Sequence, residues 1–289
     1  MRKIALVLFI FFVSGFVSGQ KMSAYQIYSS KGKKVKFKKL TKSIKEIEYV
    51  FFGEYHDNPI SHWLQYEVMA IMHSAYSNNL VMSFEMFEQD QQSLMDSLIN
   101  KVISFKEYEE KARLWPNYKT DYKPLLEFAV ENSLNCIASN IPRRYASIMF
   151  KYGRDSLNQL SDLEKSWICP LDFEIDSTLS QYISIGEMAV HMEGMSGQDL
   201  MQAQAIKDAT MAYFMLKKRR EDDVVLHING AFHTDFHQGI MWYIQKADPN
   251  AEIITISTVT QSDISKLESE NLGRADYIIC VPETMTSTH

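Results

Sequence analysis

The stretch "VVLHINGAFHTDFH", residues 224–237, shows how the chain is organised. An apolar run ends abruptly in Asn229 and Gly230, a pair that favours a tight turn. His233 and His237 then follow, four positions apart. The stretch predicts a buried strand that delivers two histidines just beyond its carboxyl end.

A second stretch near the other end of the chain has the same arrangement. In "YVFFGEYHDNPISH", residues 49–62, an apolar run ends in Gly53 and Glu54, and His56 and His62 follow. Glycine followed by histidine after a strand suits a metal site, a catalytic site or only the turn chemistry of the fold. The other strand ends help to separate these three interpretations.

Short apolar runs alternate with longer segments of helical period, which is the pattern of an α/β domain. The expected strands are 49–53, 80–85, 135–139, 224–228, 253–258 and 277–281. The expected helices are 60–76, 89–100, 104–114, 122–132, 142–152, 198–219 and 234–246. We therefore expect one α/β domain, residues 20–289, with a central, mostly parallel sheet flanked by helices. A helical flap, roughly residues 154–197, is expected before the fourth strand.

Ionisable or polar side chains follow four of the expected strands. Glu54, Glu85, Asn140 and His233 stand at or just after the strand ends, and ligands of open α/β sheets bind outside the carboxyl ends of the strands. Turn chemistry explains Asn140, but it does not explain two carboxylates, which raise each other's pKa in one cleft unless a cation is nearby. We therefore expect a site at this edge of the sheet.

An arginine is the expected counter-charge of this site. Arg143 and Arg144 follow Pro142 in the opening of a helix, where the helix dipole disfavours a cation. Each should therefore bind something anionic, either the carboxylates of Glu54 and Glu85 or an anionic group of a ligand.

The first 19 residues have the pattern of a signal peptide. Arg2 and Lys3 precede the apolar run 4–13, and small residues at 17–19 suit cleavage before Gln20. We expect export to a periplasm or an outer membrane; an uncleaved membrane anchor is the alternative. No cysteine follows the run, so a cysteine-anchored lipoprotein is not expected.

Composition narrows the class of partner. The 289 residues are 46% hydrophobic, enough for one sizeable core. The formal net charge is −6 and most basic residues are scattered, so a nucleic-acid surface is not expected. Cys136, Cys169 and Cys280 lack metal-ligand spacing; they are either buried thiols or include one disulfide, whose pairing the sequence leaves open.

Several linked motifs resemble the ChaN-like family of haem-binding proteins associated with iron uptake. The motifs are "FGEYHDNPISH" with Gln65, "FEMFEQDQQ", "WPNYKTDYKPLLEFA", "IASNIPRR", "AQAIKDATMA" and "NGAFH", in this order over residues 50–238. Linked motifs of this kind are far more specific than glycine and histidine alone. The family lies in a superfamily with the TIKI proteases and erythromycin esterases.

The resemblance implies an α/β domain with an ionisable sheet edge. The residues that it implies at this edge are Glu54, His56, Glu85 and His233, with Arg143 or Arg144. It also implies haem binding, often by a pair of subunits. A homodimer and an outer-membrane haem receptor or transport system are the partners that such a role implies.

Haem requires an apolar face, an axial iron ligand and a polar group for its propionates, and residues 182–215 offer much of this. Met188 and Met192 lie at helical spacing beside His191. A methionine-rich core also explains this pattern, but the resemblance favours haem. Ferric haem suits an oxygen or nitrogen donor, so Tyr182 and His191 are the expected ligands of the haem iron. Other tyrosines remain open, namely Tyr118, Tyr122 and Tyr213.

Gln204 and Asp208 belong to one of the matched motifs and are four residues apart on an expected helix. Residues at this spacing lie on the same face of a helix. They either face the sheet-edge site or form a polar stripe.

A hydrolase is the alternative function. Glu54 or Glu85 is then the general base, His56 and His233 are proton carriers or ligands of a divalent metal, and Arg143 stabilises negative charge. The chain lacks H-E-x-x-H, a nucleophile elbow and a phosphate-binding loop, which disfavours zinc peptidases of that type, serine hydrolases and nucleotide enzymes. The histidines expected on helix surfaces or in the core are His62, His73 and His237.

Overall fold

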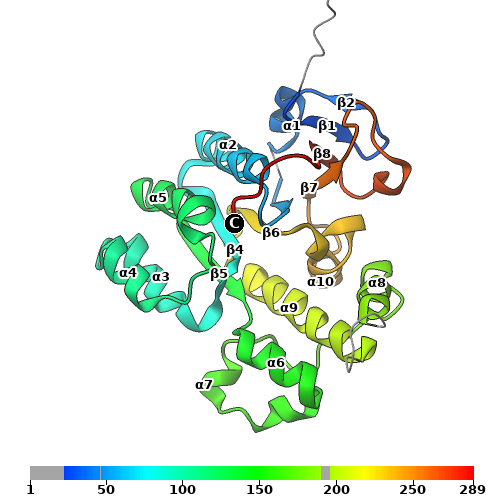
Figure 1. The fold of residues 1–289 in the computed structure, drawn as a ribbon. Coiled ribbons are helices and arrows are strands. Elements are labelled where there is room, and N and C mark those ends of the chain that lie inside the picture. Colours follow the sequence, from blue (N-terminus) through cyan, green and yellow to red (C-terminus); the bar gives the residue numbers. More distant parts are fainter. Residues whose placement is uncertain (1–22, 46, 190–195) are drawn as a thin grey trace, which may run out of the picture.

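The strands form a single sheet. The computed structural model describes residues 23–45, 47–189 and 196–289, and in this part of the chain eight strands pair in the order β2-β1-β8-β7-β3-β6-β4-β5 (Figure 1). The strands are β1 (Gln26–Ser29), β2 (Lys34–Val35), β3 (Tyr49–Glu54), β4 (Leu80–Glu88), β5 (Asn135–Asn140), β6 (Val224–Gly230), β7 (Ile253–Gln261) and β8 (Tyr277–Pro282). Strands β3 to β8 are parallel to one another, and β1 is antiparallel to β2 and β8. The expected fold class is confirmed.

Three elements of the fold differ from the sequence prediction, namely β1, β2 and one helix. Strands β1 and β2 were not predicted because they are short and contain polar residues, so they form no apolar run. The helix expected over 234–246 begins later, as α10 (Ile240–Ala247). Phe236 and His237 have φ values of 57° and 59°, in the left-handed region, which breaks the helical path.

Alternate residues of the central strands face two layers of helices. Val50 and Phe52 of β3 belong to the apolar cluster between the sheet and the first layer of helices. Tyr49 and Phe51 belong to the apolar cluster between the sheet and the second layer. The first layer contains α2 (Pro59–Tyr76), α3 (Gln92–Ile99), α4 (Phe105–Lys111) and α5 (Lys123–Glu131). The second contains α9 (Gly197–Lys218) and α10 (Figure 1). Both faces of the sheet are therefore buried, as parallel sheets require.

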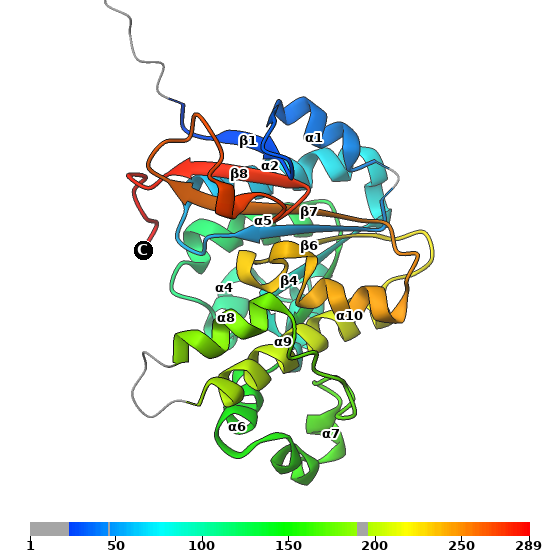
Figure 2. The ribbon, with the colours of Figure 1, turned by 90° about the vertical axis from the view of Figure 1, so that its right-hand side faces the viewer.

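A helical region lies between β5 and β6 in the chain. It contains α6 (Arg143–Tyr152), α7 (Asp162–Lys165) and α8 (Ser180–Ala189), followed by α9. Tyr145 and Met149 of α6 pack with Ile206 of α9 in a separate apolar cluster, and α8 runs beside α9 (Figure 2). This packing places α8 near the carboxyl ends of the central strands. The remaining helix, α1 (Phe37–Ser43), precedes β3.

The described residues leave the signal-peptide prediction untested, because residues 1–19 lie outside them. Over the ranges that are described, no helix has both the length and the apolar character needed to cross a membrane. Cys136, Cys169 and Cys280 are buried free thiols. Burial raises the pKa of Cys169 and Cys280 to about 12, so these thiols are poor nucleophiles.

Candidate functional site

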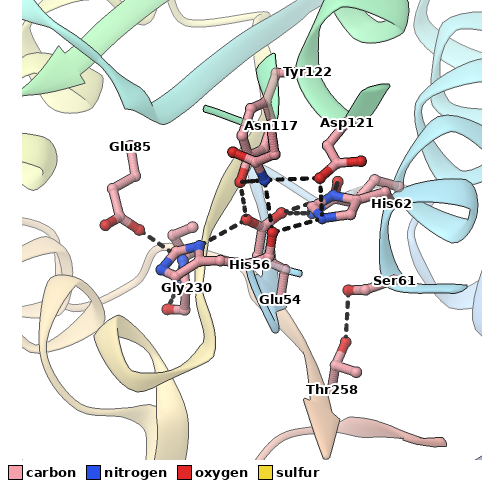
Figure 3. Close-up of polar contacts among 12 residues, drawn as sticks. Glu54, His56, Ser61, His62, Glu85, Asn117, Asp121, Tyr122, Gly230 and Thr258 are labelled. Carbon is pink, nitrogen blue, oxygen red and sulfur yellow. Dashed lines mark hydrogen bonds and ion pairs between the residues drawn. The ribbon is translucent and has the colours of Figure 1, made fainter. Parts of the chain in front are cut away.

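The ends of β3 and β6 lie side by side. Glu54, the last residue of β3, is paired in register with Gly230, the last residue of β6. A Cβ atom at Gly53 would lie 2.8 Å from the backbone of Ala231, so glycine is required for this close approach. The polar residues that follow the two strands therefore meet at one edge of the sheet (Figure 3).

The carboxylate of Glu54 is buried and contacts four polar side chains. Its Oε1 accepts a hydrogen bond from the hydroxyl group of Tyr122 at 2.6 Å and lies 2.9 Å from Nδ1 of His56. Gln65 donates to Oε2, which lies 3.4 Å from Nδ1 of His62. Burial and the Glu54 carboxylate raise the pKa of Tyr122 well above its ordinary value, so this phenol keeps its proton and stays a donor.

His62 extends this network toward a second carboxylate. It lies in the first turn of α2, which begins where the Asn58 side chain accepts hydrogen bonds from two backbone N–H groups. Nε2 of His62 lies 3.2 Å from Oδ2 of Asp121 and 3.1 Å from the carbonyl oxygen of His56. Asn117 donates to the same Asp121 oxygen at 2.7 Å. His62 was expected on a helix surface or in the core, and it is buried. It also belongs to the site.

His56 is the partly exposed member of the cluster. Its side chain is 42% exposed, and its ring meets the edge of Trp115 with 5.0 Å between ring centres. A Cβ atom at Gly230 would lie 2.8 Å from Cε1 and Nε2 of His56, so the ring rests on the glycine backbone. Burial would lower the pKa of His56, but the hydrogen bond to Glu54 and the charge of Glu85 outweigh burial and raise it. Glu54 therefore orients a ring whose Nε2 has no hydrogen-bond partner among the described residues.

A second carboxylate–histidine group lies across β6. Glu85 is at the carboxyl end of β4, and its Oε2 accepts a hydrogen bond from the N–H of Gly230 at 2.6 Å. Nε2 of His233 lies 3.2 Å from Oε1 of Glu85, and its Nδ1 contacts Oδ1 of Asp208. Gln204 also contacts the His233 ring. Gln204 and Asp208 therefore face the sheet-edge site, which decides between the two expectations for this helix.

In this second group a histidine, and not an arginine, carries the positive charge beside the carboxylates. Burial would lower the pKa of His233, but the carboxylates of Glu85 and Asp208 outweigh burial and raise it to about 10. Burial would likewise raise the pKa of Glu85, yet the charge of His233 lowers it well below its ordinary value. His233 is therefore an imidazolium ion at neutral pH, held between two acids.

The predicted pairing of an arginine with Glu54 and Glu85 is wrong, and the alternative, an anionic group of a ligand, stays a prediction. Arg143 is exposed, and Nη1 of Arg144 binds Oδ2 of Asp90 at 2.7 Å. The Arg144 guanidinium also lies 4.4 Å from the ring centre of Tyr145. Arg144 is thus paired with Asp90 and not with Glu54 or Glu85, and His233 supplies the positive charge beside Glu85.

A cleft of about 400 Å³ opens beside the two carboxylate–histidine groups. Four of the polar residues already described line it, namely Glu54, His56, Gln204 and His233. Its apolar lining includes Ile185 and Met188 of α8 with Phe232. Tyr55, which is 40% exposed, also lines the cleft. Such a cleft suits a ligand with a broad apolar surface and a polar centre.

The family of this chain follows from its sequence together with this arrangement. A sequence model of the family described as "Haem-binding uptake, Tiki superfamily, ChaN" matches residues 40–244. The chain belongs to this family. No curated protein sequence matches it.

Solved structures of the same fold include a member of this family. ChaN of Campylobacter jejuni, described with cofacial haem binding, has 18% sequence identity and a TM-score of 0.66; the likeness covers 88% of this chain and 96% of that chain. An erythromycin esterase mutant in its open conformation has 9% identity and a TM-score of 0.52, covering 92% and 98%. A succinoglycan biosynthesis protein has 9% identity and a TM-score of 0.53, covering 86% and 91%. At these identities the likeness is one of fold.

The residues predicted to bind haem fall in different places. Tyr182 is buried, 1% exposed, and its hydroxyl group donates to Oδ2 of Asp208 at 2.9 Å. Burial and the Asp208 charge raise the pKa of Tyr182 well above its ordinary value, which disfavours the phenolate that binds ferric iron. Met188 is 55% exposed and lines the cleft. His191 and Met192 lie outside the described residues.

Sequence reasoning missed three residues of the cleft. Tyr55 stands between Glu54 and His56 in the first matched motif, so its position next to two predicted site residues was an available signal. Asp235 and Arg274 also line the cleft, but Arg274 has no local motif. Within the described ranges, no group of three or more His, Cys, Asp or Glu side chains is arranged to hold a metal ion.

Proposed function

We propose that this chain is an exported haem-binding protein of an iron or haem acquisition pathway. The family and the cleft support the proposal. In the cleft, the apolar side chains of Ile185, Met188 and Phe232 are gathered with two side chains that suit ferric iron, Tyr55 and His56. This juxtaposition is the single observation that carries the proposal.

The residues present fit a haem group. When bound, haem supplies an iron centre whose axial positions take nitrogen or oxygen donors. Nε2 of His56 and the hydroxyl group of Tyr55 are the donors that the cleft offers, and Glu54 fixes the His56 ring through Nδ1. Tyr182 could bind the iron only if its hydrogen bond to Asp208 were broken first. His191 stays a prediction from the sequence.

Partners and location extend the same proposal. Tyr55 and His56 are each about two-fifths exposed, so haem bound to them would keep one face open. A second copy of the chain would cover that face, which makes a homodimer with haem between its subunits the proposed assembly. Export to a periplasm or an outer membrane, and delivery by a haem receptor or transport system, complete the proposed role.

The proposal is tested by titrating the chain from Gln20 onward with haemin, while following Soret absorbance and mass in solution. We expect a saturable shift, and Tyr55→Phe or His56→Gln should change its position or weaken binding. Matched controls are Tyr152→Phe, at a 72% exposed tyrosine, and His73→Gln, whose ring packs against Phe128. A weak, non-saturating change with the unaltered chain would overturn haem binding.

A hydrolase is the second candidate, because two histidine–carboxylate groups border one cleft. In this role Glu54 holds His56 as a proton carrier, and Glu85 with Asp208 holds a protonated His233 that could stabilise a developing negative charge. Esterase and peptidase assays test this function. Turnover that is lost in both His56→Gln and His233→Gln, with the fold intact, would favour it over haem carriage.

A further inference from the structure

Arg274 is a charged residue of the cleft that lies beyond the family match, which ends at residue 244. It stands between a short helical turn, Ser269–Asn271, and strand β8. Its Nη1 donates to Oδ2 of Asp235 at 2.6 Å, and its guanidinium lies 5.1 Å from the ring centre of Phe236. The backbone carbonyl of Arg274 also accepts the N–H of Phe236 at 2.7 Å. The cation is therefore fixed to the left-handed turn that follows β6.

The guanidinium retains unused hydrogen-bonding capacity. An arginine side chain has five N–H donors, and in the described chain only the Nη1 contact with Asp235 is found for Arg274. Its Nε is buried without an acceptor. The side chain is 23% exposed and forms part of the cleft wall. Because Nε is buried, the N–H groups of Nη1 and Nη2 that Asp235 does not use are the donors that remain for an arriving acceptor.

A purely structural role accounts for only part of this arrangement. Asp235 is 2% exposed and needs a counter-charge, and its other oxygen accepts a hydrogen bond from Ser257 at 2.6 Å. That role explains the Nη1 contact, but it does not require Arg274 to line a cleft. Of the two acidic residues that line the cleft, Asp235 is paired with Arg274, and Glu54 accepts hydrogen bonds from Tyr122 and Gln65. Arg274 is therefore an oriented cation at the cleft that a carboxylate of a ligand can meet.

We infer that Arg274 binds a carboxylate group of the ligand that occupies the cleft. The ligand class is a flat, apolar molecule with carboxylate arms, because the same cleft presents Ile185, Met188 and Phe232. Resting on the proposed function, this inference assigns a haem propionate to Arg274. Arginine suits the role because its planar fork matches the two oxygens of a carboxylate.

The test compares haemin with haemin dimethyl ester, which lacks the free carboxylates. Arg274→Gln alone would leave buried Asp235 unpaired, so the main variant is Asp235→Asn with Arg274→Gln, which removes both charges together. We expect haemin to bind on the order of tenfold more weakly to this double variant, as for a lost charge-assisted hydrogen bond, and the ester to bind as it does to the unaltered chain. Asp235→Asn alone frees the cation and should bind haemin at least as tightly as the unaltered chain.

The matched control is Arg219→Gln. Arg219 also binds a carboxylate, Glu48, at 2.6 Å and lies over an aromatic ring, Tyr49, but at the opposite end of β3. The Arg219→Gln variant should bind haemin and haemin dimethyl ester as tightly as the unaltered chain does. Equal haemin affinity of the double variant and the unaltered chain would overturn the role of Arg274 while leaving haem binding in place. Failure of the unaltered chain to bind either compound would overturn the proposed function itself.

Discussion

Tyr182 and Asp208 are joined by a buried hydrogen bond of 2.9 Å, from the tyrosine hydroxyl group to Oδ2 of the aspartate. The other oxygen of Asp208 contacts His233, which in turn contacts Glu85. Helix α8, which supplies part of the apolar wall of the cleft, is thus connected to the sheet edge through consecutive polar contacts. We therefore expect the position of α8 to respond to the charge state of His233.

Replacing Tyr182 by Phe should lower the free energy of unfolding by about 1.5–3 kcal/mol, because a buried hydrogen bond to a charged group is lost. The matched control is Tyr118→Phe. The Tyr118 hydroxyl group is buried without a hydrogen-bond partner in the described chain, so its removal should cost little. Urea denaturation measures both changes.

Haemin titration of the same Tyr182→Phe variant separates two roles of this residue. We expect the Soret shift to persist, since the hydroxyl group is engaged with Asp208. Loss of the shift in a folded variant would instead assign Tyr182 as the iron ligand, and α8 would then have to rearrange on binding.

Stability should depend on pH through His233. Its pKa is raised to about 10 in the folded chain, against about 6.5 when unfolded. A raised pKa means that the folded state holds the proton more tightly. The stabilisation is therefore complete below about pH 6.5 and is lost as pH rises toward 10, by at most about 1.4 kcal/mol per pH unit.

Denaturation between pH 6.5 and 10 checks this dependence. His233→Gln should remove the loss over this window, whereas His237→Gln, at a histidine 36% exposed, should retain it. Glu85 has the opposite pH dependence, because its pKa is lowered in the folded chain. Its contribution to stability is present at pH values above its unfolded pKa and is lost as pH falls. A flat profile for the unaltered chain would contradict the charge assigned to His233.

Replacing Gly230 by Ala should displace His56. The new Cβ would lie 2.8 Å from Cε1 and Nε2 of that ring, which is partly exposed and can turn away, losing its hydrogen bond to Glu54; this loss costs about 0.5–1.5 kcal/mol. Gly186→Ala is the control, because in the described part of the chain the nearest atom to its Cβ would be the carbonyl oxygen of Gly197, at 3.6 Å. In helix α8 that change should stabilise the chain by about 0.5–1 kcal/mol. Thermal unfolding and haemin affinity report both effects.

Replacing Arg144 by Gln should leave haemin affinity unchanged. Its ion pair with Asp90 involves an arginine side chain that is 46% exposed, and such pairs contribute about 0–1 kcal/mol to stability. Isothermal titration with haemin provides the measurement. A clear loss of haemin affinity would show that Arg144 takes part in haem binding, against the contacts that the structure gives it.

The sequence by itself determined strands β3 to β8 of the sheet and the residues at their ends. The apolar runs of β3 and β6 stop at glycine, and the parallel direction of the strands brings Glu54, Glu85 and His233 to one edge. These features are local, since an apolar run, a turn residue and a polar side chain beyond it lie within a few residues. The linked motifs determined the family for the same reason.

Only the tertiary structure decided which groups face one another. Arg144 had the right charge near the right strand, but the direction of α6 gave it Asp90 as partner. Tyr182 had the right chemistry for iron, but packing of α8 on α9 gave it Asp208. Arg274 reaches Asp235 across 39 residues. Pairing at this range depends on helix direction and packing, which a run of neighbouring residues does not encode.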